Sequence, residues 1–254
     1  MIESMWASGY YGFLSDYLWW WIVLGILGAN TWGFLRLSRA WRAKKTRLIV
    51  GNVCVLAMMA VAVGMVCETY LRFLSVATDP HGVTVTHKRW QAAYASVNSL
   101  SYRDKEWAEG DRADVRRIAF VGDSFTYGWG IDDPRNRFTE LVQGQFDRLG
   151  EKVEVMNVAW AGWGTKQQIP AVRYLIELYG VDEVVLCHLP NDIEDCLPKR
   201  AGTDLTKPPR PKWFRPESSF LFDYLYYRLY VPWARGGAEY FDWLADGYAD
   251  PESW

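Results

Sequence analysis

The sequence contains few cysteines, few histidines and no motif typical of metal or nucleotide binding. Its 254 residues include the four cysteines Cys54, Cys67, Cys187 and Cys196, and no two of them have the Cys-x-x-Cys spacing of a zinc site. Cys187 and Cys196 could pair in an oxidising compartment, but free or buried thiols are the simpler interpretation. No glycine-rich nucleotide loop occurs either. We therefore expect no cofactor and no bound metal.

The chain also lacks the excess of positive charge that nucleic-acid binding requires. Its formal net charge is −2, and the residues after Leu74 carry 21 Lys and Arg against 27 Asp and Glu. An acidic domain of this kind is poorly matched to a phosphate backbone. We expect no nucleic acid among the partners.

Two long stretches contain no charged residue at all. Residues 17–35 and 48–66 are uncharged, and each is long enough to cross a bilayer core of roughly 30 Å as a helix. The loop between them, residues 36–47, has six Lys and Arg and no acidic residue, which predicts a cytoplasmic loop. The acidic lead before residue 17 has neither the basic start nor the cleavage site of a signal peptide.

These features predict a transmembrane hairpin whose two ends are extracytoplasmic, or periplasmic in a Gram-negative cell. A buried helical hairpin in a soluble core is the alternative, but uncharged spans of this length are rare in soluble domains. Small residues at four-residue spacing, Gly25, Ala29 and Gly33, suit close helix contacts in lipid. These residues could pack the two spans against each other or dock a partner. With 15 Trp and an aromatic-rich surface, the sequence allows membrane-protein partner subunits besides the lipid bilayer itself.

The sequence predicts a division into six segments. These are an extracytoplasmic lead (1–16), a first transmembrane helix (17–35), a basic cytoplasmic loop (36–47), a second transmembrane helix (48–67), a connector (68–115) and an α/β domain (116–254). The connector is polar, and its later part, Val97–Glu106, shows no strong helical period, so we expect that part to lie along the domain surface.

Within the α/β domain, apolar runs and helical periods alternate. We expect strands at Ile118–Val121, Val153–Ala159 and Val181–Leu189, and helices at Phe138–Leu149 and Lys166–Tyr179. This alternation predicts a flavodoxin-like parallel sheet with right-handed crossovers. Further along, Ser219–Tyr230 and Ala238–Ala245 are helix candidates, and we expect the aromatic residues of the first to belong to a core.

Each predicted strand ends in residues that suit acyl-transfer chemistry. Gly122-Asp123-Ser124 follows the first strand, Asn157 and Gly162 mark the end of the second, and Asn191-Asp192 follows the third. The carboxyl ends of parallel strands share one edge of a sheet, which is where such sheets bind ligands. A serine hydroxyl, an exposed backbone amide and an asparagine side chain at this edge would supply a nucleophile and oxyanion donors.

From about Asn98 onward the sequence resembles the SGNH/GDSL hydrolase family. The segment GDSFTYGWG is similar to the first block of that family, Asn157 with Gly162 to the second, and Asn191-Asp192 to the third. The resemblance implies that Ser124 is the nucleophile, and that the amides of Ser124 and Gly162 and the Asn191 side chain form the oxyanion hole. It implies supporting roles for Gly122, Asp123, Asn157 and Asp192. In the third block, Leu189 stands where the family usually has glycine.

The general base of that family is a histidine in a C-terminal Asp-x-x-His block, which this sequence does not contain. The three histidines are His81, His87 and His188. We expect His81 and His87 to be surface residues of the connector. His188 could substitute as the base, but an ordinary strand-end histidine is the simpler interpretation. The general base is therefore unknown, and the SGNH-type sheet looks incomplete at its C-terminus.

Two hypotheses follow. In the first, the protein is a membrane-anchored extracytoplasmic serine esterase, acyl hydrolase or O-acyltransferase, whose missing base lies beyond residue 254. In the second, it is a catalytically inactive SGNH-like accessory or scaffold subunit of a larger membrane complex. The residues do not identify an acyl substrate.

Overall fold

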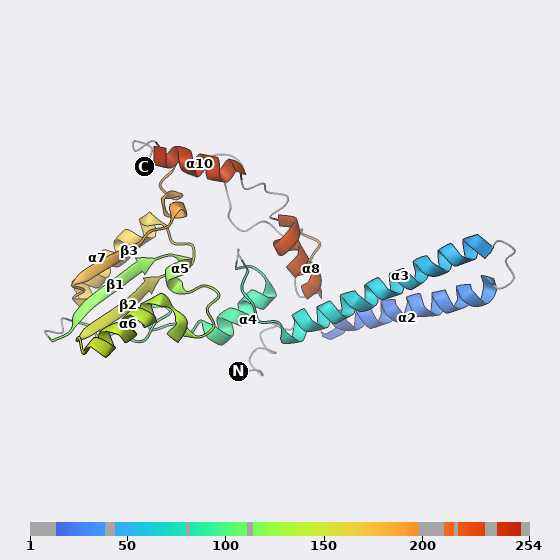
Figure 1. Ribbon diagram of the computed structural model, residues 1–254, viewed down its shortest axis with the longest axis horizontal. Helices are drawn as coiled ribbons and strands as arrows, with labels where there is room; N and C mark the ends of the chain where they lie inside the picture. Colours follow the sequence, from blue (N-terminus) through green and yellow to red (C-terminus); the bar gives the residue numbers. More distant parts are fainter. Residues whose placement is uncertain are drawn as a thin grey trace. The chain divides into compact units, whose positions relative to one another are not determined.

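The structure is a computed structural model that describes residues 14–38, 44–79, 82–110, 114–197, 211–215, 218–231 and 238–249. In chain order the helices and strands are α2 (Leu14–Leu37), α3 (Lys44–Thr69), the π-helical turn η2 (Tyr70–Leu74), α4 (Val85–Tyr94), β1 (Arg116–Gly122), α5 (Ser124–Tyr127), η3 (Pro134–Asn136), α6 (Phe138–Leu149), β2 (Val153–Ala159), α7 (Thr165–Tyr179), β3 (Glu183–Cys187), η4 (Pro190–Ile193), α8 (Phe220–Leu225), the π-helical η6 (Tyr226–Tyr230) and α10 (Ala238–Ala249) (Figure 1).

The chain folds into two compact units that alternate along the sequence. One unit comprises Met1–Arg89 and Lys207–Ala234, and the other comprises Trp90–Thr206 and Arg235–Trp254. The first contains the helical hairpin and α8. The second contains the sheet and the predicted active-site residues.

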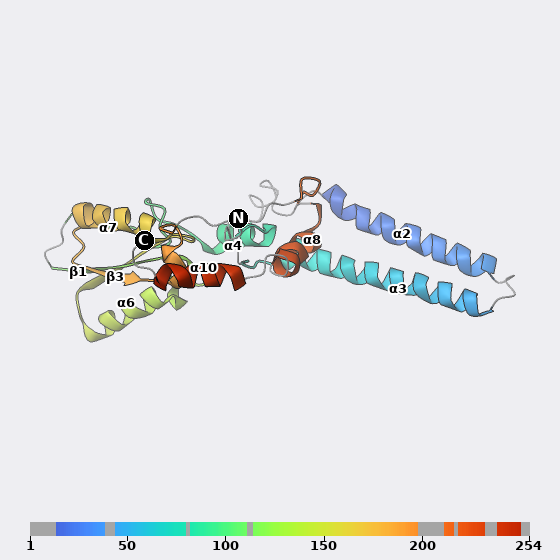
Figure 2. The same ribbon diagram turned by 90° about the horizontal axis from the view of Figure 1, so that it is seen from above.

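The first unit is built on two helices that are long and apolar enough to cross a membrane. The spans run from Ser15 to Leu37 and from Lys44 to Leu74, and they lie side by side as an antiparallel pair (Figures 1 and 2). Their apolar side chains are largely exposed, among them Trp19 at 61 % and Leu56 at 64 %. A surface of this kind needs a cover other than water.

Close contacts between the two helices occur at glycines other than those of the Gly25–Gly33 stripe. A Cβ atom added at Gly64 would lie 3.2 Å from the Trp20 ring, whereas one at Gly25 or Gly33 would meet nothing within 4 Å. The hydroxyls of Tyr17 and Thr69 are 2.8 Å apart and join the start of α2 to the end of α3. The stripe therefore does not pack the two helices together.

The second unit is a three-stranded parallel sheet with the order β2-β1-β3, as the sequence predicted for an α/β domain. Strand β2 and helix α6 have the predicted bounds, and α7 begins one residue earlier. Strand β1 is longer than predicted at both ends, and β3 is shorter because Val181, Asp182, His188 and Leu189 lie outside the ladder.

Helices cover both faces of this sheet, with α7 on one side and α6 on the other (Figure 2). Alternate residues of a strand point to opposite faces. Ala119 and Val121 accordingly pack in the α7 cluster with Leu175, whereas Ile118 packs with Phe146 of α6. Strand β3 is an outer strand, and its side chains are much more exposed than those of β2.

The connector departs from the expectation that it lies along the surface. It contains the helix α4, and Trp90, Tyr102 and Trp107 are at most 9 % exposed. Tyr102 and Trp107 belong to the same core cluster as Ala119 and Leu175. The prediction relied on the polar residues that separate these aromatic residues. Large aromatic side chains can stabilise a core even where their spacing along the chain is irregular.

Two further expectations need correction. His87 is fully buried rather than on the surface; Pro80 and His81 lie outside the described residues. The aromatic helix expected at Ser219–Tyr230 divides into α8 and η6, and its aromatic residues do not all belong to a core. Phe220 and Tyr227 are buried, but Tyr230 is 52 % exposed.

Candidate active site

The predicted site residues follow strand ends that the ladder aligns. Gly122 of β1 pairs with Ala159 of β2 and with Cys187 of β3. The segments carrying Ser124, Gly162 and Asn191 therefore leave the sheet at one common edge. This is the carboxyl edge, where open α/β sheets bind ligands.

Ser124 lies at the first position of the short helix α5, directly after a sharp turn. The Asp123 side chain caps this helix by accepting a hydrogen bond of 2.9 Å from the Phe125 amide. The Ser124 hydroxyl is half-buried and lies 3.5 Å from Oδ2 of Asp123. The turn thus presents a serine at the sheet edge without enclosing it.

Gly122 is required by the close packing of this turn. A Cβ atom at this position would lie 2.2 Å from Oγ1 of Thr126 and 3.1 Å from Cβ of Cys187. Any side chain would push α5 away from β1 and β3. The supporting role predicted for Gly122 thus has a steric basis in this structure.

The two other predicted oxyanion donors are accessible to solvent. Gly162 has a φ of +84°, which favours glycine, and a Cβ there would meet no atom within 4 Å. Asn191 is exposed at the start of η4. Both residues are therefore exposed to solvent near the strand ends.

Asn157, in contrast, is buried and serves the scaffold. Its Nδ2 donates to the Thr126 carbonyl at 2.7 Å and to Oγ1 of Thr139 at 3.0 Å. Its backbone amide donates to Oδ2 of Asp104 at 2.8 Å. Asn157 therefore joins α5, α6 and the connector beneath the Ser124 turn.

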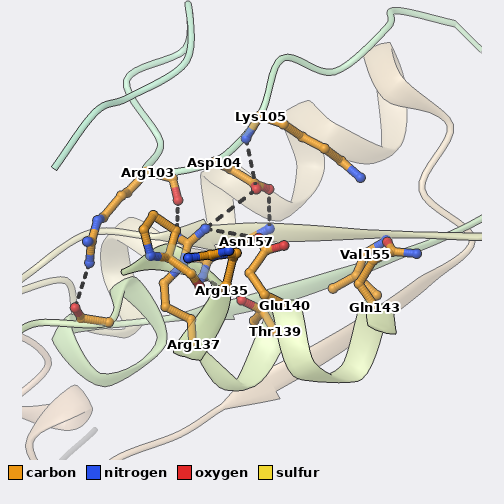
Figure 3. Close-up of polar contacts among 12 residues, drawn as sticks. Arg103, Asp104, Lys105, Arg135, Arg137, Thr139, Glu140, Gln143, Val155 and Asn157 are labelled. Atoms are coloured by element: carbon orange, nitrogen blue, oxygen red, sulfur yellow. Dashed lines mark hydrogen bonds and ion pairs between the residues drawn. The ribbon is translucent and has the colours of Figure 1, made fainter. Parts of the chain in front are cut away.

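A buried charge network surrounds Asn157, and Figure 3 shows it between the connector and α6. Arg137 lies 3.9 Å from Asp104 and donates to Glu140 at 3.0 Å. Arg103 donates to the carbonyls of Gly128 and Ile131, each at 2.7 Å. These bonds hold the loop that follows Ser124.

Burial shifts the pKa values of several groups in and below this site. It raises the pKa of Asp104 and of Asp123, and it lowers the pKa of Arg103, which Arg137 lowers further. Burial also raises the pKa of the Cys187 thiol, which disfavours the thiolate. All four cysteines are free thiols.

Asp192 is fully buried and fastens η4 to α7. Its Oδ2 accepts hydrogen bonds from the Leu189 amide and from Nε2 of Gln168, both at 3.1 Å. Its carbonyl accepts from Oγ1 of Thr165 at 3.0 Å. These three hydrogen bonds fix the loop that begins at Leu189.

His188 follows β3 and lies between two polar side chains. Its Nδ1 lies 3.5 Å from Oδ2 of Asp192, and its Nε2 lies 2.7 Å from the hydroxyl of Tyr248 in α10. A carboxylate beside one ring nitrogen fixes the orientation of the imidazole. The four-residue spacing of His188 and Asp192 was the available signal, whereas nothing in the sequence pointed to Tyr248.

The described residues contain no group of three or more His, Cys, Asp or Glu side chains that could hold a metal ion. The chain matches no family model, no curated protein and no solved structure. The function therefore has to be argued from the site itself.

Proposed function

We propose that the protein is a membrane-anchored, extracytoplasmic serine hydrolase or O-acyltransferase of the SGNH/GDSL type. The observation that carries the proposal is the position of Ser124, on a tight strand-to-helix turn at the carboxyl edge of the sheet. The strand order β2-β1-β3 supports it, because flavodoxin-like sheets begin with this order.

In this proposal Ser124 attacks an acyl ester. The Oγ–C bond forms as the carbonyl π bond breaks, and the developing oxyanion accepts hydrogen bonds from the amides of Ser124 and Gly162 and from the Asn191 side chain. The open surroundings of Gly162 leave room for the acyl group. Expulsion of the alcohol leaves an acyl-enzyme, and water or an acceptor hydroxyl releases the acyl group.

His188 is the base of this mechanism, and Asp192 orients it. His87 belongs to the other compact unit, so His188 is the one described histidine of the unit that carries Ser124. Its Nε2 takes the Ser124 proton and later donates it to the leaving alcohol. For this step the Tyr248 hydroxyl, now bonded to Nε2, has to move aside.

The membrane location rests on the hairpin. Two helices long enough to span a bilayer, joined by a loop with six basic residues, favour a cytoplasmic loop and an extracytoplasmic Ser124. Ester substrates on the outer side of the membrane, such as O-acylated glycans or lipids, fit this location.

Hydrolysis of p-nitrophenyl acetate by the full-length protein in detergent micelles tests the serine mechanism. We expect Ser124→Ala to abolish turnover, and His188→Gln to lower kcat by roughly 10²- to 10⁴-fold, the usual contribution of a general base. Equal rates in wild type and Ser124→Ala would refute the serine mechanism. Loss in Ser124→Ala with an unchanged rate in His188→Gln would refute only the base assignment.

Two observations favour a second function, an inactive accessory subunit of a membrane complex. The base nitrogen of His188 is bonded to Tyr248 and not to Ser124, and the outer strand β3 presents Val184 and Leu186 to solvent. Purification from native membranes in mild detergent separates the two functions. A stable hetero-complex without esterase activity supports the subunit, and an active monomer refutes it.

A further inference from the structure

The first unit carries an exposed apolar groove that the proposed catalysis does not use. We call it the aromatic groove; it has a volume of about 650 Å³ and is lined chiefly by Trp213, Phe222, Leu225, Tyr226, Leu229 and Tyr230. The rings of Phe222, Tyr226 and Tyr230 stack in sequence, with centroid distances of 6.1 and 5.3 Å. Trp213 is 76 % exposed and Leu229 is 63 % exposed. A solvated groove of this composition marks a binding surface.

Buried hydrogen bonds fix the helix of this groove to the end of α3. The carboxylate of Glu68 accepts from the amides of Phe220 and Leu221, at 3.1 and 2.9 Å, and from the Ser219 hydroxyl at 3.0 Å. Arg72 pairs with Glu68 at 2.8 Å and donates to the Ser218 carbonyl at 3.1 Å. These bonds fix the position of the groove along the hairpin, beside residues 68–72.

This position lies just after the uncharged run of residues 48–66. The bond between Tyr17 and Thr69 lies at the same turn of α3, and Tyr70 beside it is 56 % exposed. Trp19 and Trp21, at the start of α2, are also exposed. Exposed tyrosine and tryptophan at the end of a membrane span occupy the boundary between lipid headgroups and acyl chains.

Among the described residues 211–215 and 218–231, the exposed charged side chains are all basic. Lys212, Arg215 and Arg228 are exposed, whereas Asp223 is buried and accepts a hydrogen bond from the Val85 amide. Arg215 also lies 3.8 Å from Asp16, and Arg228 donates to the Thr78 carbonyl. Apolar and aromatic residues combined with basic ones are typical of elements that lie in a membrane interface and contact anionic lipid.

We infer that the aromatic groove packs against the lipids of the bilayer that the hairpin spans. Acyl chains near the headgroups fill the groove, and the basic residues contact anionic headgroups. This inference rests on the membrane anchoring in the proposed function, but not on catalysis by Ser124. It gives the first unit a membrane contact in addition to its two helices.

Photo-crosslinking from lipid tests this contact. The full-length protein is reconstituted in nanodiscs of phosphatidylcholine and phosphatidylglycerol that contain a phosphatidylcholine with a diazirine on its acyl chain. After photolysis, adducts are mapped by mass spectrometry. We expect adducts on α2, on α3 and on residues 213–230. The double variant Trp213→Glu, Leu229→Glu should lose the adducts of residues 213–230 and keep those of the helices.

Leu149→Glu is the matched control, because Leu149 is an equally exposed leucine on α6 of the other unit. It should leave all adducts unchanged. Adducts on α2 and α3 without adducts on residues 213–230 would overturn the inference and leave the anchoring intact. Adducts on residues 213–230 that persist in the double variant would also overturn it. No adducts on either helix would refute the anchoring itself.

Discussion

The turn that carries Ser124 is packed so closely at two glycines that neither position has room for a Cβ atom. Thr126 and Cys187 pack over Gly122, and side-chain carbons of Arg137 lie within 2.7 Å of where a Cβ of Gly128 would be. Gly128 also has a φ of +79°. Close packing therefore requires glycine at both positions, and at Gly128 the positive φ requires it as well.

Gly122→Ala should destabilise the sheet unit by about 1–3 kcal/mol, because the added methyl overpacks the turn. Gly144→Ala is the matched control, since Gly144 lies within α6 and a Cβ there meets nothing within 4 Å. Alanine there should raise stability by about 0.5–1 kcal/mol, as expected in a helix. Urea unfolding in detergent micelles, followed by near-UV circular dichroism, measures both changes. An equal effect of the two substitutions would contradict the packing described for Gly122.

Asp123→Asn should become more stable relative to wild type as the pH rises. Burial raises the pKa of Asp123 above its ordinary value of 3.8 in the folded protein. The folded state then binds more protons than the unfolded state above pH 3.8, so wild type loses stability until the folded pKa is passed. Asparagine removes this loss and still caps α5.

Unfolding measured from about pH 2.5 to 7 tests this expectation for Asp123. Asp133→Asn is a control of opposite sign, because hydrogen bonds from Arg135 lower the pKa of Asp133. Relative to wild type, that variant should become slightly less stable as the pH rises to about 4, because wild type gains stability there and asparagine does not titrate. A difference between wild type and Asp123→Asn that does not change with pH would contradict the burial effect.

At the scale of helices and strands, the sequence pattern predicted those elements whose bounds depend on neighbouring residues in the chain. The bounds of α6 and β2 follow from apolar spacing and from the glycine that ends α6, and the structure confirms them. The connector could not be predicted in this way. Trp90 and Trp107 are buried by contacts with residues far along the chain, and no periodicity of the connector itself reveals them.

The candidate site also contains one part that the sequence could predict and one part that it could not. The order of Ser124, Gly162 and Asn191 at neighbouring strand ends could be predicted, since a parallel sheet aligns such ends. The pairing of His188 with Tyr248 could not, because it joins a strand end to a helix 60 residues later. Whether these residues act in catalysis stays a prediction.

The contact between α3 and α8 also depends on one side chain, Glu68. Glu68→Ala should lower the free energy of unfolding by about 3–5 kcal/mol, because it leaves the buried Arg72 without the carboxylate of Glu68. The amides of Phe220 and Leu221 should lose protection from hydrogen exchange, which mass spectrometry measures. Glu183→Ala is the control, since the exposed pair of Glu183 with Arg116 contributes little. Unchanged exchange at Phe220 and Leu221 would contradict the role of Glu68.

At the scale of the whole molecule, the chain contains two units with different surroundings. The hairpin unit exposes two helices that are long and apolar enough to cross a membrane, and the sheet unit presents Ser124 on an α/β scaffold. The basic loop predicts which side of the membrane the sheet unit occupies. In the proposed function, chemistry and anchoring reside in separate units, and each can be tested without the other.

The central claim is that Ser124 is an activated nucleophile, and a fluorophosphonate tests it most directly. The reagent is added to the full-length protein in detergent at neutral pH, and peptides are mapped by mass spectrometry. We expect one adduct on Ser124, slower formation in His188→Gln and none in Ser124→Ala. If wild type stays unlabelled at Ser124 while a control serine esterase reacts fully, Ser124 is not an activated nucleophile.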